Sequence, residues 1–122
     1  MHNAAFAAVG LDWAYVPLPT PADRLEEAVR GLAALGFAGA NVTTPHKLAV
    51  AALCETEAPS VNTLVVRDGR IEGYSTDAAV VDGLPAEQPV VLGDGGTAVA
   101  FLNSLPHARQ FARRGSWPPD VA

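Results

Sequence analysis

The chain has 122 residues, of which 49% are apolar and 17% are charged, so it can bury a core and is not disordered by composition. Thirteen acidic residues against eight basic ones give a formal charge of -5, which argues against the basic face that nucleic-acid binding requires. No apolar run approaches the roughly 18 residues of a membrane span, and Met1-His2-Asn3 does not resemble the start of a signal peptide. We therefore expect a cytoplasmic α/β protein, in which the single Cys54 excludes an internal disulfide and a cysteine-based zinc site.

The front part of the chain is predicted to alternate helices with strands. An Ala-rich segment that ends at Gly10 is typical of a helix, and the aromatic segment 13–18 predicts a short strand that Pro17 ends or confines to an edge. Thr20 and Pro21 are typical of a helix start, and leucines recurring at helical spacing carry this helix to Gly36. The front elements we expect are helices at 3–9, 20–35 and 43–53 and strands at 13–18, 37–42, 61–66 and 70–74.

The dipeptide Asp68-Gly69 between two apolar runs predicts a β-hairpin, because both residues tolerate positive φ. Behind it we expect a short helix at 77–84, a strand at 88–92, a helix at 97–105 and a strand at 108–112. Alternating strands and helices imply a largely parallel α/β sheet. A proline-marked seam near 85–89 divides the chain into residues 1–86, a small mixed or parallel-sheet domain, and residues 87–122, a single incomplete Rossmann-like β-α-β unit.

Polar residues follow the predicted strand 37–42, where α/β folds place ligand groups. Asn41 and Thr43 can donate and accept hydrogen bonds toward a hydroxylated ligand, and Lys47 adds a positive charge just inside the next helix. The alternative is that Asn or Thr caps this helix and Lys47 is solvated. His46 has no second ligand at metal spacing, so no metal site is expected.

The two ends of the predicted hairpin carry Asn62 and Asp77. Antiparallel arms bring these residues toward the same edge of the sheet. A lysine and a carboxylate meeting there could shuttle a proton, with the ammonium donating to a developing alkoxide. The alternative is that Asp77 only caps the short helix behind it.

A glycine turn follows the predicted strand 88–92. Gly93, Gly95 and Gly96, with Thr97 opening the next helix, let the backbone approach a diphosphate, although the spacing is G-x-G-G rather than G-x-G-x-x-G. A plain tight turn is the alternative, and Asp94 would repel phosphates unless it points away. One strand later, Arg113 suits the 2′-phosphate of NADP, or is a solvated basic residue at a strand end.

In their order and in their residues these segments resemble the shikimate dehydrogenase family. The resemblance covers nearly all of the first hundred residues. Its most specific motifs are N-V-T-T-P-H-K at 41–47, V-N-T-L at 61–64, T-D at 76–77 and L-G-D-G-G at 92–96.

The resemblance implies NADP-dependent, reversible reduction of 3-dehydroshikimate to shikimate. Lys47 and Asp77 would be the catalytic acid–base pair, and Asn41, Thr43 and Asn62 would bind substrate. The positions implied for the cofactor are Gly93, Gly95, Gly96, Thr97 and Arg113. No metal, nucleic acid or membrane partner is implied.

The chain departs from the family pattern in places. The family has a strand and a serine-rich turn ahead of His2-Asn3, Asn where Ser75 stands, and further cofactor-domain segments after the first β-α-β unit. These departures predict an open sheet edge and possible homodimerisation through it. They also keep open a second hypothesis, a catalytically inactive remnant of the family that binds a ligand or self-assembles. A stand-alone dinucleotide-binding protein is a third reading, disfavoured because one β-α-β unit offers little wall around a cofactor.

Overall fold

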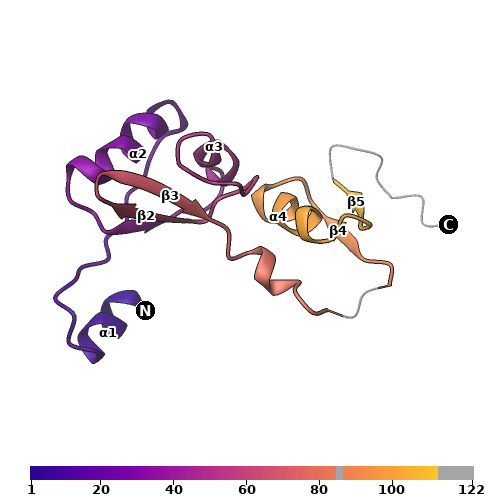
Figure 1. Ribbon diagram of the computed structural model, residues 1–122, viewed down its shortest axis with the longest axis horizontal. Helices are drawn as coiled ribbons and strands as arrows, with labels where there is room; N and C mark the ends of the chain where they lie inside the picture. Colours follow the sequence, from indigo (N-terminus) through magenta and orange to yellow (C-terminus); the bar gives the residue numbers. More distant parts are fainter. Residues whose placement is uncertain (85–86, 113–122) are drawn as a thin grey trace.

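A computed structural model describes residues 1–84 and 87–112. Two units lie along its long axis, a front unit built on an antiparallel sheet and a rear β-α-β unit (Figure 1). The helices are α1 (His2–Ala8), α2 (Leu25–Ala34), α3 (Lys47–Ala51) and α4 (Gly96–Ser104), with 3-10 turns η1 (Ala22–Arg24) and η2 (Ala78–Val80). The strands are β1 (Gly39–Asn41), β2 (Thr63–Arg67), β3 (Arg70–Tyr74), β4 (Val90–Leu92) and β5 (Arg109–Phe111).

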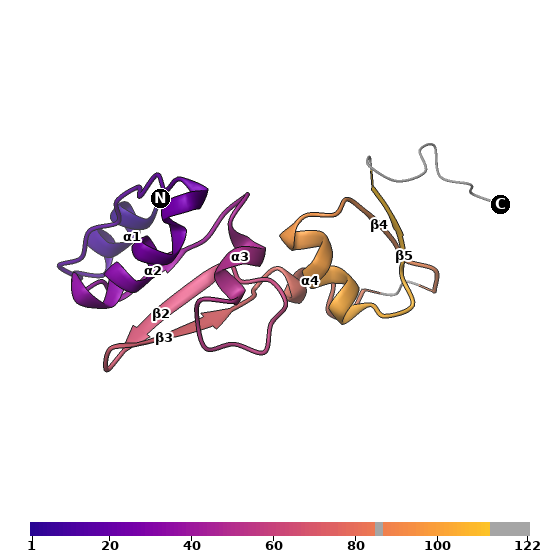
Figure 2. The ribbon, with the colours of Figure 1, turned by 90° about the horizontal axis from the view of Figure 1, so that it is seen from above.

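The front core lies between α2, α3 and the sheet. Leu25, Val29 and Leu32 recur at helical spacing on α2 and are buried, as the apolar periodicity predicts. They cluster with Val50 of α3 and with Leu64 of β2, so both helices rest on one face of the sheet. Figure 2 shows α2 and α3 beside β2 and β3, with the rear unit beyond α3.

The hairpin forms as predicted. Asp68 and Gly69 have φ of 51° and 77°, and Arg67 pairs with Arg70 across this turn of two residues. β2 also pairs with β1, again antiparallel, which gives the order β1-β2-β3. The α/β class is confirmed, whereas the expectation of a largely parallel sheet holds only for the rear unit. There β4 and β5, which precede and follow α4 in the chain, pair with each other in parallel.

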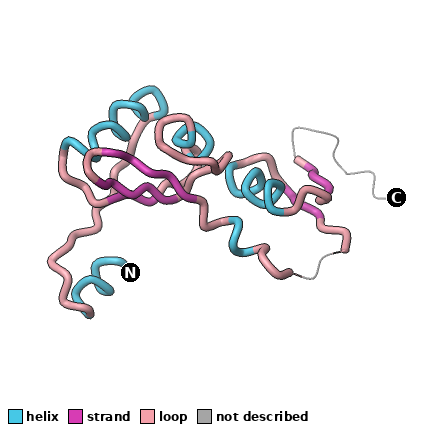
Figure 3. Tube along the Cα trace, viewed as in Figure 1, coloured by secondary structure: helices cyan, strands magenta, loops and turns pink. Residues whose placement is uncertain are grey.

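The prediction of a strand at 13–18 is wrong. The segment has no regular secondary structure and runs as an exposed loop between α1 and α2 (Figure 3). Its backbone is satisfied locally, because the side-chain amide of Asn3 donates to the carbonyl of Tyr15 (2.9 Å) and accepts from its N–H (2.6 Å). A side chain therefore takes the place of a neighbouring strand at this residue.

Three further elements are shorter or differently capped than expected. The helix predicted at 43–53 is confined to α3, and the one at 77–84 to the 3-10 turn η2. Thr20 does not cap the second helix, because its hydroxyl donates to the carbonyl of Leu18 at 3.0 Å. The helices before Gly10 and Gly36 end as predicted, with both glycines at positive φ.

Candidate active site

The open end of the hairpin brings Asn62 and Asp77 together, as the antiparallel pairing predicts. The backbone N–H of Asn62 donates to the carbonyl of Tyr74 at 3.0 Å, which continues the ladder past β2 and β3. Asn62 Nδ2 then donates to Asp77 Oδ1 at 2.9 Å. The chain leaving β3 is thereby held beside the residue that enters β2.

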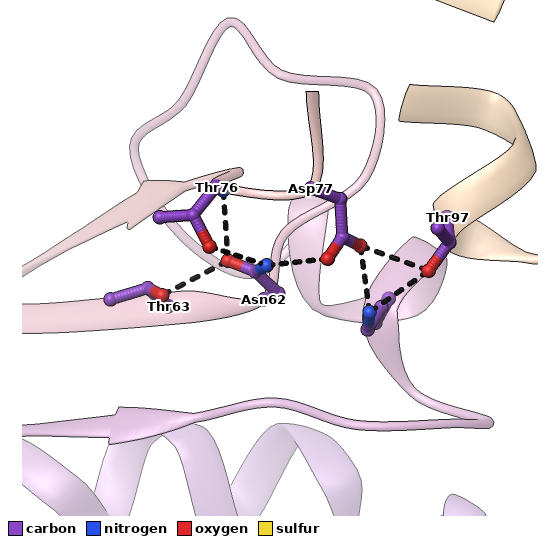
Figure 4. A network of polar contacts seen from close by, with 6 residues as sticks. Asn62, Thr63, Thr76, Asp77 and Thr97 are labelled. Carbon is purple, nitrogen blue, oxygen red and sulfur yellow. Dashed lines mark hydrogen bonds and ion pairs between the residues drawn. The ribbon is translucent and has the colours of Figure 1, made fainter. Parts of the chain in front are cut away.

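Lys47 reaches this point from the start of α3. Its backbone carbonyl accepts from the N–H of Val61 at 2.9 Å, which fixes α3 to the segment that enters β2. Its Nζ lies 2.7 Å from Asp77 Oδ2, and the two side chains are 15% and 17% exposed. Figure 4 shows the network of polar contacts around Asp77, in which Lys47 is the one side chain without a label. The structure thus joins two residues that lie 30 positions apart in the chain.

Asp77 is ionised in this setting. Burial alone would raise the pKa of its carboxyl, but hydrogen bonds from Lys47, Asn62 and Thr97, together with the charge of Lys47, hold that pKa below its ordinary value. Asp77 stands at the N-cap position of η2, yet its side chain makes no capping hydrogen bond. The cap interpretation is therefore wrong, and the carboxylate serves the network around Lys47.

Asn62 is locked in place by two threonines that sequence reasoning did not assign to the site. Its Nδ2 also donates to Thr76 Oγ1 at 2.9 Å. Its Oδ1 accepts from the N–H of Thr76 at 3.1 Å and from the hydroxyl of Thr63 at 2.9 Å. The hairpin register, which sets the start of β2 opposite the end of β3, was the signal that could have found Thr76.

Asn41 and Thr43 lie next to this network, in the wall of a separate cavity. The carbonyl of Asn62 accepts from the N–H of Val42 at 2.8 Å, so the segment that leaves β1 runs beside Asn62. The cavity of about 730 Å³ has otherwise mostly apolar walls from α2, β1 and the loop before α2, and Lys47 does not line it. Asn41 Oδ1 accepts from the hydroxyl of Tyr15 at 3.2 Å.

His46 contacts the loop that precedes α2. Its Nε2 lies 2.9 Å from the carbonyl of Thr20. Among residues 1–84 and 87–112, no group of three or more His, Cys, Asp or Glu side chains is arranged to hold a metal ion.

The glycine turn leaves an open stretch of backbone ahead of α4. Gly93 has φ of 127°, which an L side chain rarely adopts, and a Cβ added at Gly95 would meet nothing within 4 Å. α4 begins directly behind Gly95 with no side-chain cap, so the amides of its first turn are not taken by a capping side chain. Asp94, beside these glycines, is exposed to solvent. The residues present therefore suit the diphosphate of a dinucleotide.

Gly96 and Thr97 do more than shape the turn. A Cβ at Gly96 would lie 2.6 Å from Lys47 Cβ and 2.7 Å from Ser60 Oγ, so the missing side chain lets α4 pack against the stem of Lys47. The Thr97 hydroxyl contacts the Lys47–Asp77 pair, an arrangement that sequence reasoning missed. Arg113, predicted to receive a 2′-phosphate, lies outside the described residues.

The helices that the structure describes include none with the length and apolar character to cross a membrane.

Comparison with known proteins identifies shikimate dehydrogenases as relatives of this chain. A family model described as the shikimate dehydrogenase substrate binding domain matches residues 1–64. The shikimate dehydrogenase (NADP(+)) of Geobacter sp. strain M21 is 44% identical over 120 residues, which cover 86% of this chain and 41% of that relative. The protein of the same name from Anaeromyxobacter sp. strain Fw109-5 is 43% identical, with 100% of this chain and 48% of the relative covered. The chain thus spans less than half the length of these relatives.

Solved structures give the same result. A shikimate dehydrogenase in complex with NADP+ superposes with a TM-score of 0.78 and 31% identity, covering 93% of this chain and 45% of that one. The shikimate 5-dehydrogenase of Thermus thermophilus, in complex with NADP(H) and shikimate, superposes with a TM-score of 0.74 and 27% identity, covering 93% and 49%.

Proposed function

The chain belongs to the shikimate dehydrogenase family, and from that premise we propose that it carries the acid–base pair of an NADP-dependent oxidoreductase that interconverts 3-dehydroshikimate and shikimate. The observation that carries the proposal is the contact between Lys47 and Asp77. Their charged groups meet at 2.7 Å, largely out of solvent, beside a glycine turn that suits a diphosphate. An enclosed ammonium held by a carboxylate is equipped to give or take a proton on a substrate oxygen.

Lys47 is the proton donor in the direction of ketone reduction. An ammonium has three N–H bonds, and those that Lys47 directs at Asp77 and Thr97 leave one for the substrate oxygen. As the C3 carbonyl becomes an alkoxide, this proton moves from Nζ to the oxygen, and the amine regains a proton from solvent. In the reverse direction the amine accepts the hydroxyl proton.

Asp77 stabilises the protonated form of Lys47 throughout the reaction. It stays a carboxylate, because its pKa is held below the ordinary value, and it stabilises the ammonium each time that form returns. Asn62 holds Oδ1 of this carboxylate, so that Oδ2 faces Lys47.

Three residues are proposed to bind the hydroxyl groups of the substrate ring. Asn41, Thr43 and Asn62 carry amide and hydroxyl groups that can both donate and accept. Those of Asn62 are engaged by Thr63, Thr76 and Asp77, so Asn62 would exchange one of these hydrogen bonds for a substrate hydroxyl. The contact between the Val42 N–H and the Asn62 carbonyl supports their acting together.

The cofactor is proposed to be held by the rear unit. We assign residues 1–86 to substrate binding and 87–122 to cofactor binding. Gly93, Gly95 and Gly96 would face the diphosphate through their backbone, and Arg113 would meet the 2′-phosphate. When bound, the nicotinamide supplies the hydride to C3 of 3-dehydroshikimate or accepts it from shikimate.

The test is the NADP-dependent change in absorbance at 340 nm with shikimate, for the wild-type chain and for Lys47→Ala. We expect turnover with NADP in excess of that with NAD, and a loss of about 10³-fold in kcat for Lys47→Ala, the range for an acid–base group. Circular dichroism checks that the variant is folded. Shikimate binding without turnover in the wild-type chain would overturn the catalytic proposal in favour of a ligand-binding module.

A further inference from the structure

We propose that Thr97 is a positioning residue of the acid–base pair, held against Lys47 and Asp77 by the packing of Gly96. The proposal rests on the function proposed above and adds a residue from the cofactor half to the proton-handling network. Sequence reasoning placed Thr97 among the cofactor contacts, and the geometry points to a different role.

Thr97 contacts both members of the acid–base pair. Lys47 Nζ donates to Thr97 Oγ1 at 3.1 Å, and the Thr97 hydroxyl donates to Asp77 Oδ2 at 3.0 Å. With the Lys47–Asp77 contact of 2.7 Å these bonds close a triangle, which Figure 4 draws in dashed lines. The hydroxyl has one proton to donate, and the triangle uses it on the carboxylate.

The Thr97 hydroxyl sets the direction of the N–H bonds of Lys47. An ammonium on a four-carbon stem has rotatable donors and much conformational freedom. A carboxylate alone therefore does not fix the directions of the other two N–H bonds of the ammonium. A second acceptor fixes the rotation of the group about its Cε–Nζ bond. The Thr97 hydroxyl is that acceptor, and the remaining N–H is thereby aimed at one place.

The same hydroxyl also acts on the carboxylate of Asp77. Asp77 Oδ1 is held by Asn62, and Oδ2 is shared by Lys47 and Thr97. A donor to the charged form stabilises it, so loss of the Thr97 hydroxyl favours protonation of the carboxyl. The same loss removes one restraint on where Oδ2 lies relative to Nζ.

The packing of α4 keeps the Thr97 hydroxyl in place. α4 is 9 residues long, and its first residue, Gly96, packs against the stem of Lys47 and against the fully buried Ser60. Any side chain at Gly96 would move α4 outward and would take Thr97 with it. Thr97 follows the glycine turn directly, so a change in the turn also moves the hydroxyl.

The experiment compares Thr97→Val, which keeps the shape but lacks the hydroxyl, with Thr97→Ser, which keeps the hydroxyl. Asn103→Ala, an exposed position near the end of the same helix, is the control. The first readout is the titration of the Asp77 carboxyl by carbon-13 NMR, with the resonance assigned from its absence in Asp77→Asn. This readout needs neither cofactor nor turnover.

We expect the titration of Asp77 to move to higher pH in Thr97→Val, and to stay at its wild-type position in Thr97→Ser and Asn103→Ala. In the 340 nm assay, Thr97→Val should lose about 5- to 10-fold in kcat with little change in KM for NADP, the effect of one hydrogen bond, and Thr97→Ser should recover it. If Thr97→Val does not fold, Thr97→Ala replaces it in both measurements.

An unchanged Asp77 titration in a folded variant without the hydroxyl would overturn the proposal. So would a raised KM for NADP at unchanged kcat, because Thr97 would then be a cofactor ligand. An inactive wild-type chain contradicts the proposed function instead, and the NMR titration still decides the place of Thr97.

Discussion

Each end of the β2–β3 hairpin has an ion pair, and the two pairs differ in how far they are exposed to solvent. At the turn end, Arg70 donates to Glu55 with a Nε–Oε1 distance of 3.0 Å, and the side chains are 68% and 54% exposed. At the open end, Lys47 and Asp77 meet at 2.7 Å and are 15% and 17% exposed. The distances are similar, so exposure is the difference between the pairs.

Exposure decides what each pair can do. Charges in water are screened, and an exposed ion pair contributes little to stability. The pair at the open end is enclosed by groups that complete its hydrogen bonds, contributed by Asn62 and Thr97. Enclosure strengthens the interaction, so we place the proposed chemistry at the open end and regard the exposed pair at the turn end as solvated surface.

Replacing Asp77 should have the largest effect among the following changes. Asp77→Asn keeps the shape but removes the charge that supports the ammonium, and we expect kcat to fall by about 10²- to 10³-fold. Shikimate binding, measured by calorimetry, should change far less. A kcat equal to that of the wild-type chain would remove Asp77 from the mechanism and the distinction between the two ends with it.

Thr43→Val sharpens the assignment of substrate contacts. The variant leaves a substrate hydroxyl without its partner, so we expect KM for shikimate to rise by about 10-fold, at a kcat close to the wild-type value. Steady-state kinetics at several shikimate concentrations separate the two constants. A kcat loss without a change in KM would mean that Thr43 acts on the acid–base pair and not on binding.

The fall in the free energy of unfolding at low pH should also distinguish the two ends of the hairpin. Asp77 has a lowered pKa in the folded chain, so its stabilisation is present above the ordinary pKa of an aspartate and is lost as pH falls through the lowered value. The pKa of Glu55 is lowered too, first by its hydrogen bond from Arg70, but both groups are exposed.

Urea unfolding as a function of pH measures this difference. Asp77→Asn should flatten the loss of stability in acid, and the effect should persist in about 0.5 M salt, where the Debye length is only about 4 Å. Glu55→Gln should flatten it less, and salt should abolish the effect. An effect of Asp77→Asn that also disappeared in salt would show that the open end is as solvated as the turn end.

Arg70→Ala should have the smallest effect. The residue lies at the turn end with its partner exposed, so turnover should stay within about twofold of the wild-type value. The 340 nm assay run beside Asp77→Asn makes this the matched control for removing a charge from the same hairpin. A loss comparable to that of Asp77→Asn would mean that the two ends act together.

Local patterns predicted those parts of the fold that are stabilised locally. The apolar period of α2 and the Asp68-Gly69 turn were sufficient for a helix and a hairpin, and the hairpin then predicted that Asn62 and Asp77 meet. The segment 13–18 has strand propensity, but a strand needs a partner, and propensity does not reveal that Asn3 satisfies Tyr15 instead.

The candidate site likewise has one part that the sequence predicts and one part that it does not. The pairing of Lys47 with Asp77 could be inferred because one hairpin and one helix start bring them together, across 30 positions. The place of Thr97 could not, since it lies 50 positions from Lys47 and depends on the packing of Gly96. Its position after a glycine turn favoured a cofactor contact, and only the tertiary structure places its hydroxyl against Lys47.

The most direct measurement follows deuterium from C3 of labelled shikimate, with NADP, in the wild-type chain and in folded Lys47→Ala. We predict that the wild-type chain delivers the label to the nicotinamide and none to water, and that Lys47→Ala does so about 10³-fold more slowly. Equal rates of transfer in the two chains, or label appearing in water, would contradict the claim that Lys47 moves the proton while a hydride leaves C3.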